Sequence, residues 1–179
     1  MRQDQYTYHQ LVKLRKLLGY KSIMIISEAS VGDALLMMQL HERSIMELCR
    51  DDYTQEQLKD WLNQSTLEKY QVRLEKHRSY IAERDGKMIG YVRWNPETNE
   101  LCSIFVDPAC VRQGIATDLM NTAYKDARKH GVKELWLDAS NTAVPFYEAI
   151  GWDTIKLSMH GSLEGVRMTK RLSHGKVEI

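Results

Sequence analysis

The sequence predicts an α/β fold in which helices cover both faces of a mixed sheet. Three observations support this class. Apolar residues recur at helical spacing between Ala34 and His77, the period changes to two residues at Tyr80, and helical and strand-like segments alternate after Ile104. The expected order of elements from Ser22 onward is β-α-α-α-β-β-β-α-β-α-β-β.

Composition and charge exclude several classes of protein. The 179 residues carry 25 basic and 24 acidic side chains, a formal net charge of +1, and 43% of them are hydrophobic. This balance excludes a disordered chain and a strongly basic nucleic-acid binder. The longest apolar run, Ala34 to Met38, is far too short to cross a membrane, and the N-terminus shows no secretory signal. We therefore expect a cytoplasmic protein with neither a membrane nor a nucleic-acid partner.

Cysteine and histidine spacing predicts no metal centre. The three cysteines are odd in number and form no C-x-x-C pair, and the six histidines form no H-x-x-x-H pair. We expect free thiols and no metal. No Pro/Gly-rich linker divides the chain, so we expect a helical extension over residues 1–20, one domain over 21–172 and a tail over 173–179.

The first half of that domain predicts one strand and three helices. Ser22–Ala29 is β-branched and apolar, and Ser30 opens a helix. The residues expected on the buried face of this helix are Ala34, Leu35, Met38, Ile45 and Leu48. Thr54 and Gln57 form a capping box before a second helix, and a third helix runs over Leu67–His77.

The second half predicts an antiparallel meander followed by alternating elements. Asp85-Gly86 and the segment 95–99 supply turns between the meander strands. The predicted strands are Tyr80–Glu83, Met88–Trp94, Leu101–Val106, Glu134–Ala139, Asp153–Met159 and Val166–Leu172. The predicted helices are Ile115–His130, which Gly131 ends, and Thr142–Ile150.

The segment from Ile104 to Ala116 has the composition of an anion site. A strand, a glycine-containing loop and a helix N-terminus follow one another, so free N–H groups and the positive end of the helix dipole converge there. Gly114 allows a close approach of the backbone to a phosphate, and Thr117 adds a hydroxyl. The loop is neither a P-loop nor a G-x-G-x-x-G fingerprint.

A second segment, Asn141–Trp152, strengthens the functional prediction. Together the two segments resemble the GNAT superfamily of acetyl-CoA-dependent N-acetyltransferases, whose motifs are (Q/R)-x-x-G-x-(G/A) and a later N-x-x-x-x-F-Y-x-x-x-G-F/W. The resemblance extends from Ser22 to Leu172. It implies a three-layer fold with a mostly antiparallel sheet of six or seven strands, and acetyl-CoA as cosubstrate.

The resemblance also implies roles for individual residues. Amides of the loop hold the pyrophosphate, and main-chain groups at the end of the strand align the pantetheine and polarise the thioester. The residues so implied to bind acetyl-CoA are Ile104, Phe105, Val106, Arg112, Gln113, Gly114, Ile115, Ala116, Thr117, Asn141 and Tyr147. The first motif position, usually Gln or Arg, is Val111 here, and we expect the charge of Arg112 to compensate for the lost contact.

The implied chemistry is direct attack of an amine on a thioester. It needs a base for the ammonium, a donor to the carbonyl oxygen and an acid for the departing thiolate. By resemblance the acid is Tyr147. The residues leave the base open between Glu100, Glu83, His41, Glu42 and a water chain. An acetyl-cysteine route through Cys102 is disfavoured.

In this family the first two helices wall the acceptor side, which points to His41, Glu42 and Tyr53 as substrate-binding residues. Acidic residues between His41 and Trp61 favour a cationic amine on a small molecule, peptide or protein. Two alternatives remain: a non-catalytic acyl-CoA-binding regulatory module on the same fold, and a nucleotide-binding module. Dimerisation is common in the family, and a second copy of the chain is a candidate partner.

Overall fold

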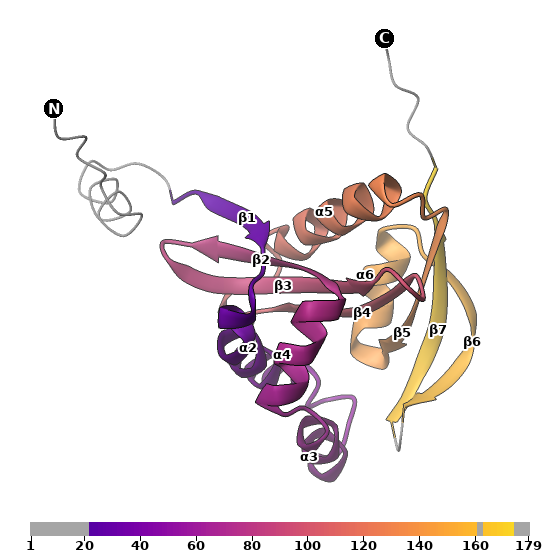
Figure 1. Cartoon of the computed structure of the whole chain (residues 1–179). Coiled ribbons are helices and arrows are strands. Elements are labelled where there is room, and N and C mark those ends of the chain that lie inside the picture. Colours follow the sequence, from indigo (N-terminus) through magenta and orange to yellow (C-terminus); the bar gives the residue numbers. More distant parts are fainter. Residues whose placement is uncertain (1–21, 161–162, 174–179) are drawn as a thin grey trace, which may run out of the picture.

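Seven strands form one mixed sheet in the computed structural model, which describes residues 22–160 and 163–173. The strand order is β1-β2-β3-β4-β5-β7-β6, so consecutive strands are neighbours from β1 to β5, and the last strand, β7, lies between β5 and the edge strand β6 (Figure 1). The strands are β1 Met24–Glu28, β2 Arg78–Arg84, β3 Lys87–Asn95, β4 Glu100–Val106, β5 Glu134–Ser140, β6 Asp153–His160 and β7 Leu163–Arg171. The predicted fold class and order of elements are confirmed.

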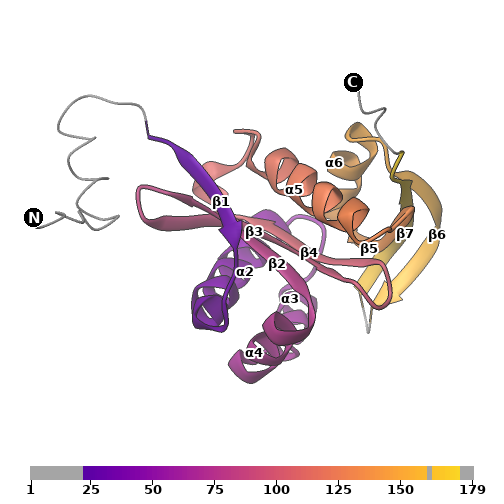
Figure 2. The same ribbon diagram turned by 45° about the horizontal axis from the view of Figure 1, so that its top comes forward.

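Helices cover both faces of this sheet. Figure 2 shows α5 and α6 on one face and α2, α3 and α4 on the other. The helices are α2 Ala34–Leu48, α3 Gln55–Asn63, α4 Leu67–Lys76, α5 Ile115–Lys129 and α6 Val144–Ala149. Short 3₁₀ turns precede α2, α5 and α6 at Val31–Asp33, Pro108–Cys110 and Asn141–Ala143. The predicted helix at 1–20 and the tail from residue 174 lie outside the described residues, and the domain limits stay predictions.

Local signals in the sequence place the helix starts. The hydroxyl of Thr54 accepts from the amide of Gln57 at 3.2 Å, and the amide of Thr54 donates to the Gln57 side chain at 2.9 Å. This is the predicted capping box, and it satisfies amides that have no partner within the helix. Ser30 and Asp33 form a similar box, which begins the 3₁₀ turn before α2.

The prediction for Leu35 was wrong. Its side chain is 46% exposed, whereas Met37, Leu40 and Ile45 are fully buried. Counting helical turns from Ala34 places positions 37, 40, 41, 44 and 45 against the sheet, and this leaves Leu35 on the outer side of α2. Apolar residues on both sides of a helix cannot identify the buried face by themselves.

The sheet parts between β4 and β5. These two strands are parallel and pair in register only at Glu100 and Trp136, whereas β5 pairs with β7 along its whole length. Two antiparallel halves, β1–β4 and β5–β7–β6, therefore meet at one narrow contact. We call the region where β4 and β5 diverge beyond Glu100 and Trp136 the split.

A bulge lies in β4 close to this contact. Arg93 of β3 faces Ser103 of β4, but the next residue, Trp94, faces Leu101, so Cys102 is an extra residue in β4. A β-bulge bends its strand and increases the local twist. The bend occurs where β4 departs from β5.

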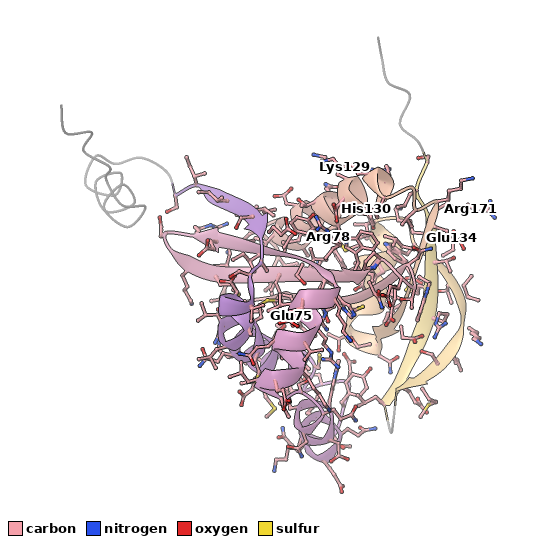
Figure 3. The ribbon with its side chains drawn as sticks, in the orientation of Figure 1. Glu75, Arg78, Lys129, His130, Glu134 and Arg171 are labelled. Atoms are coloured by element: carbon pink, nitrogen blue, oxygen red, sulfur yellow. The ribbon has the colours of Figure 1, made fainter. Side chains whose placement is uncertain are left out.

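A buried carboxylate joins α5 to the first half of the sheet. Asp126 accepts from the Arg78 Nε of β2 and from the Trp94 indole of β3, each at 3.1 Å. Figure 3 shows Arg78 close to His130, whose Nδ1 lies 3.6 Å from the Asp126 carboxylate. Burial alone would raise the pKa of Asp126, but these hydrogen bonds, above all those from Arg78, lower it overall. Among the residues with a described structure, no helix has the length and apolar content to cross a membrane.

We predict that Asp126→Asn destabilises the fold by about 1–3 kcal/mol at pH 7, because the charged acceptor of the half-buried Arg78 and the buried Trp94 indole is lost. The lowered pKa makes this stabilisation fully present above the unfolded-state pKa of about 3.9, and it is lost as the pH falls through the folded-state value. Urea unfolding at pH 7 and pH 3 measures both effects. The exposed pair of Glu134 and Arg171, 3.5 Å apart and labelled in Figure 3, supplies the control. Glu134→Gln should cost less than about 1 kcal/mol, and equal losses for the two variants would contradict the prediction.

Candidate functional site

The loop between β4 and α5 is held in place by a buried aspartate. Asp107, 4% exposed, accepts from the amide of Ala109 at 3.1 Å and lies 3.3 Å from Arg43 and 3.4 Å from Lys87. Burial would raise the pKa of Asp107, but the Ala109 amide and the two cations lower it overall. A charged Asp107 thus connects the loop to α2 and β3.

The same loop exposes backbone donors. Arg112 and Gly114 have positive φ angles of 61° and 81°, so the chain turns sharply before α5 begins at Ile115. A Cβ at Gly114 would meet nothing within 4 Å, so glycine is needed there for its conformation and not for space. The first helical hydrogen bond runs from the amide of Asp118 to Gly114. The preceding amides of α5 have no carbonyl of an earlier turn to bind.

The charge around this loop is positive. Arg112 is exposed, and Arg84 at the end of β2 donates to the Gln113 side chain at 2.6 Å. Free amides, the N-terminal end of a helix dipole and two guanidinium groups together favour a bound anion such as a diphosphate. The predicted residues Arg112 to Thr117 are brought together here.

The outer edge of β4 is open beyond the split. On one side, Ile104 and Val106 pair with β3. On the side that faces β5, no residue of β4 after Glu100 has a register partner in the described part of the chain. Ile104, Phe105 and Val106 are all half-buried. Peptide groups on this edge can therefore pair with an extended ligand that lies between the two strands.

Tyr147 lies on α6, within the core between α5 and the second half of the sheet. It is 5% exposed, and its ring packs against those of Phe146 and Trp152 at centroid distances of 5.3 and 5.6 Å. Burial, with a smaller contribution from Tyr124, raises the pKa of Tyr147. Its hydroxyl forms no hydrogen bond within the described residues, so at neutral pH it is a protonated donor without a partner.

A cavity of about 130 Å³ lies at the start of the split. Glu100 and Cys102 of β4, Asp138 of β5, Glu164 of β7, and Tyr53 and Trp61 around α3 are among its lining residues. Three carboxylates and two aromatic rings suit an amine. We call this the acceptor cavity.

Tyr53 connects the walls of this cavity. Its hydroxyl donates to the carbonyl of Glu164 and accepts from the amide of Asn141, both at 2.8 Å. One oxygen therefore joins the α2–α3 connection to β7 and to the segment that precedes α6. Asp138, in turn, accepts two hydrogen bonds from Arg167 at 2.6 and 2.7 Å.

The other predicted residues lie elsewhere. His41 is buried beneath α4, where its Nδ1 lies 2.7 Å from the Tyr70 hydroxyl. Burial, together with Arg93 and Arg73, lowers the pKa of His41 to about 3, so the ring is neutral. Glu42 is exposed on α2, and Glu83 lies on β2, two strands from β4.

Sequence analysis missed Trp61, Asp138 and Glu164. Their positions in the acceptor cavity depend on strand pairing far along the chain, and no local motif marks them. Over the described ranges, no group of three or more His, Cys, Asp or Glu side chains is arranged to hold a metal ion.

Comparison with known sequences gives one family. The family model of the acetyltransferase (GNAT) domain matches residues 49–172, more than half of the chain. An uncharacterized N-acetyltransferase of Escherichia coli K12, YafP, is 26% identical over 125 residues, which cover 70% of this chain and 78% of that protein.

Solved structures share the fold. A GCN5-related N-acetyltransferase from Rhodopseudomonas palustris matches with a TM-score of 0.77 at 26% identity, over 83% of this chain and 95% of that chain. The PaiA N-acetyltransferase from Thermoplasma acidophilum, solved in complex with coenzyme A, matches with a TM-score of 0.74 at 20% identity, over 83% and 99%. The loop before α5 and the lining of the acceptor cavity both lie within the residues matched by the family model.

Proposed function

We propose that this chain, which belongs to the GNAT acetyltransferase family and is an acyltransferase, moves the acetyl group of acetyl-CoA directly to a primary amine of a small molecule or peptide. The single contact between β4 and β5 at Glu100 and Trp136 carries this proposal, because it leaves the edge of β4 unpaired between the acceptor cavity and the anion-binding loop. The relative from Thermoplasma acidophilum, which has this fold, was solved with coenzyme A.

The residues present fit acetyl-CoA. The amides from Gln113 to Ala116 would bind the diphosphate, and Gly114 supplies the left-handed turn that presents them. The open edge of β4 at Ile104 to Val106 would pair with the amides of the pantetheine arm and polarise the thioester carbonyl. When bound, acetyl-CoA supplies the carbonyl that an amine attacks. Val111 is 38% exposed and adds no polar contact, whereas the charges of Arg112 and Arg84 lie nearby.

Tyr147 is the acid in this proposal. A thiol has a pKa of roughly 8.5, so a departing thiolate gains from a nearby proton. The raised pKa of Tyr147 keeps its hydroxyl protonated, and the hydroxyl has no partner in the described structure that would compete for the proton. Asn141, at the start of the same segment, would contact the pantetheine arm.

Glu100 is the base in this proposal. It lines the acceptor cavity at the residue where β4 and β5 meet, next to the bulge at Cys102. Of the carboxylates predicted from the sequence, Glu83 and Glu42 do not line this cavity. A carboxylate at this position can take a proton from an incoming ammonium before the attack.

We expect the protein to release thiol from acetyl-CoA when it is supplied with a panel of primary amines, and Gly114→Val to weaken coenzyme binding at least roughly 100-fold, because several amide hydrogen bonds to charged oxygens are lost. Thiol release and calorimetry with coenzyme A measure the two effects. Gly131 is the matched control, since its φ is 77° and a Cβ there would also meet nothing within 4 Å.

Gly131→Val should cost similar stability, about 1–2 kcal/mol, but keep coenzyme affinity. Coenzyme binding without thiol release would favour the non-catalytic module. Stabilisation by ATP and not by coenzyme A would favour the nucleotide-binding alternative.

Tyr147→Phe should lower kcat by about 100-fold or more, because the thiolate leaves without a proton, while the dissociation constant of acetyl-CoA stays close to wild type. Steady-state kinetics and calorimetry separate the two quantities. Tyr124→Phe is the control. The Tyr124 hydroxyl accepts from the Trp152 indole at 2.6 Å in the same aromatic cluster, so this substitution disturbs the cluster but leaves the Tyr147 hydroxyl in place. An unchanged kcat for Tyr147→Phe would refute the assignment.

Glu100→Gln should lower kcat/KM for the amine by about 100-fold or more and move the fall in rate at acidic pH to higher pH, because without this base the rate follows the neutral fraction of the amine. A pH profile of kcat/KM for both proteins tests this prediction. Glu97→Gln, in the exposed turn before β4, should leave the profile unchanged. An acidic limb at the same pH in Glu100→Gln as in the wild type would assign the base to a water chain.

A further inference from the structure

Three buried polar atoms without a hydrogen-bond partner lie in one row across the sheet. They are the Oγ of Ser79 and the Nε and Nη1 of Arg93, and they are the only such side-chain atoms among residues 22–160 and 163–173. Ser79 of β2 pairs in register with Arg93 of β3, which pairs with Ser103 of β4. Arg93 is 5% exposed, and its Nη2 donates to the Ser103 hydroxyl at 2.9 Å.

The row carries positive charge that no acidic side chain balances. Arg73 of α4 is half-buried on the same side of the sheet, and neither Arg73 nor Arg93 has a carboxylate within 4 Å in the described part of the chain. The two cations also affect nearby rings: burial, then Arg93 and Arg73, lower the pKa of His77 to about 4. A buried cation without a counter-charge is unfavourable, and an incoming anion reduces that penalty.

This charged row lies one residue along β4 from the acceptor cavity, although its own side chains are not among the lining residues. Ser103, which accepts from Arg93, directly follows the bulge residue Cys102, and Cys102 lines the cavity. The Cys102 sulfur lies 3.8 Å from His77 Nδ1 at the end of α4. Glu100, the proposed base, lines the cavity two residues earlier on the same strand. One strand therefore presents a carboxylate at the cavity and, three residues on, a serine that contacts a guanidinium.

We propose that Arg93, Ser79 and Arg73 form an anion subsite that binds a carboxylate carried by the amine substrate. The inference rests on the proposed acetyl transfer and names its acceptor class: a primary amine that also bears a carboxylate, such as an amino acid. The guanidinium of Arg93 has two nitrogens, Nε and Nη1, without a hydrogen-bond partner, and each can donate a charge-assisted hydrogen bond to an anion.

This class differs from the cationic amines that the acidic residues before Trp61 favour. In the structure Glu42, Glu47, Asp51, Asp52 and Glu56 are all exposed, and none of them lines the acceptor cavity. The cavity carboxylates suit an ammonium, and the buried guanidinium of Arg93 lies behind the cavity wall, beside Ser103. A zwitterionic acceptor is complementary to both.

The test measures thiol release with the standard amino acids and with their C-terminal amides, which keep the amine and lose the carboxylate. At least one amino acid should show a kcat/KM at least about 10-fold above that of its amide. Arg93→Gln should reduce this acid-to-amide ratio by about 30-fold or more. Arg50→Gln, an exposed arginine paired with Asp51, is the control and should keep the ratio.

Arg73→Gln and Ser79→Ala replace Arg93→Gln as test variants if Arg93→Gln does not fold. Both should fold more readily, because Arg73 is only half-buried on a helix and Ser79→Ala removes a single hydroxyl. Both should lower the same ratio. A wild-type ratio near one, or a ratio that none of these variants changes, would overturn the subsite. Activity on polyamines alone would also overturn it while leaving acetyl transfer intact.

If no amine is acetylated, the proposed function fails and thermal stabilisation decides on the subsite. The amino acids should then stabilise the wild type more than their amides do, and Arg73→Gln should lose that difference. Equal shifts with acids and amides would overturn the subsite independently of catalysis.

Discussion

The single parallel contact between β4 and β5 is the constraint on which the site depends. Because the strands pair only at Glu100 and Trp136, the edge of β4 from Ile104 to Val106 has no neighbour beyond this point. The bulge at Cys102 bends β4 at the same place. The anion-binding loop follows from the end of this strand, and the acceptor cavity lies at its start. The proposed cofactor and acceptor sites thus both lie along the seven residues of one strand.

Most of the fold could be predicted from local patterns. The period of apolar residues gave the order of elements, and Thr54 with Gln57 gave the start of α3, since both signals act over a few residues. Leu35 shows the limit of this approach. Both Leu35 and Met37 are apolar, and only the sheet that packs against α2 decides that Met37 is buried and Leu35 is not.

The candidate site also has a part that local sequence patterns predict and a part that they do not. The loop from Arg112 to Thr117 is contiguous, so the residues that form it were visible in the sequence. The acceptor cavity combines Tyr53, Asp138 and Glu164, which strand pairing brings together across more than a hundred residues of chain. Arg93 could not be identified for a different reason. It lies in a mostly buried strand, and only the structure shows that its neighbours across the sheet are Ser79 and Ser103 and that two of its nitrogens lack a partner.

The position of the Tyr53 hydroxyl has a consequence for motion. Its oxygen donates to the carbonyl of Glu164 in β7 and accepts from the amide of Asn141 in the turn before α6. A shift of the β6–β7 hairpin that widens the cavity therefore either breaks the bond to Glu164 or pulls the α2–α3 connection with it. In the second case the pull reaches Asn141 and the base of α6, which carries Tyr147. In the proposed reaction, widening of the cavity and the position of Tyr147 are therefore coupled through the Tyr53 hydroxyl.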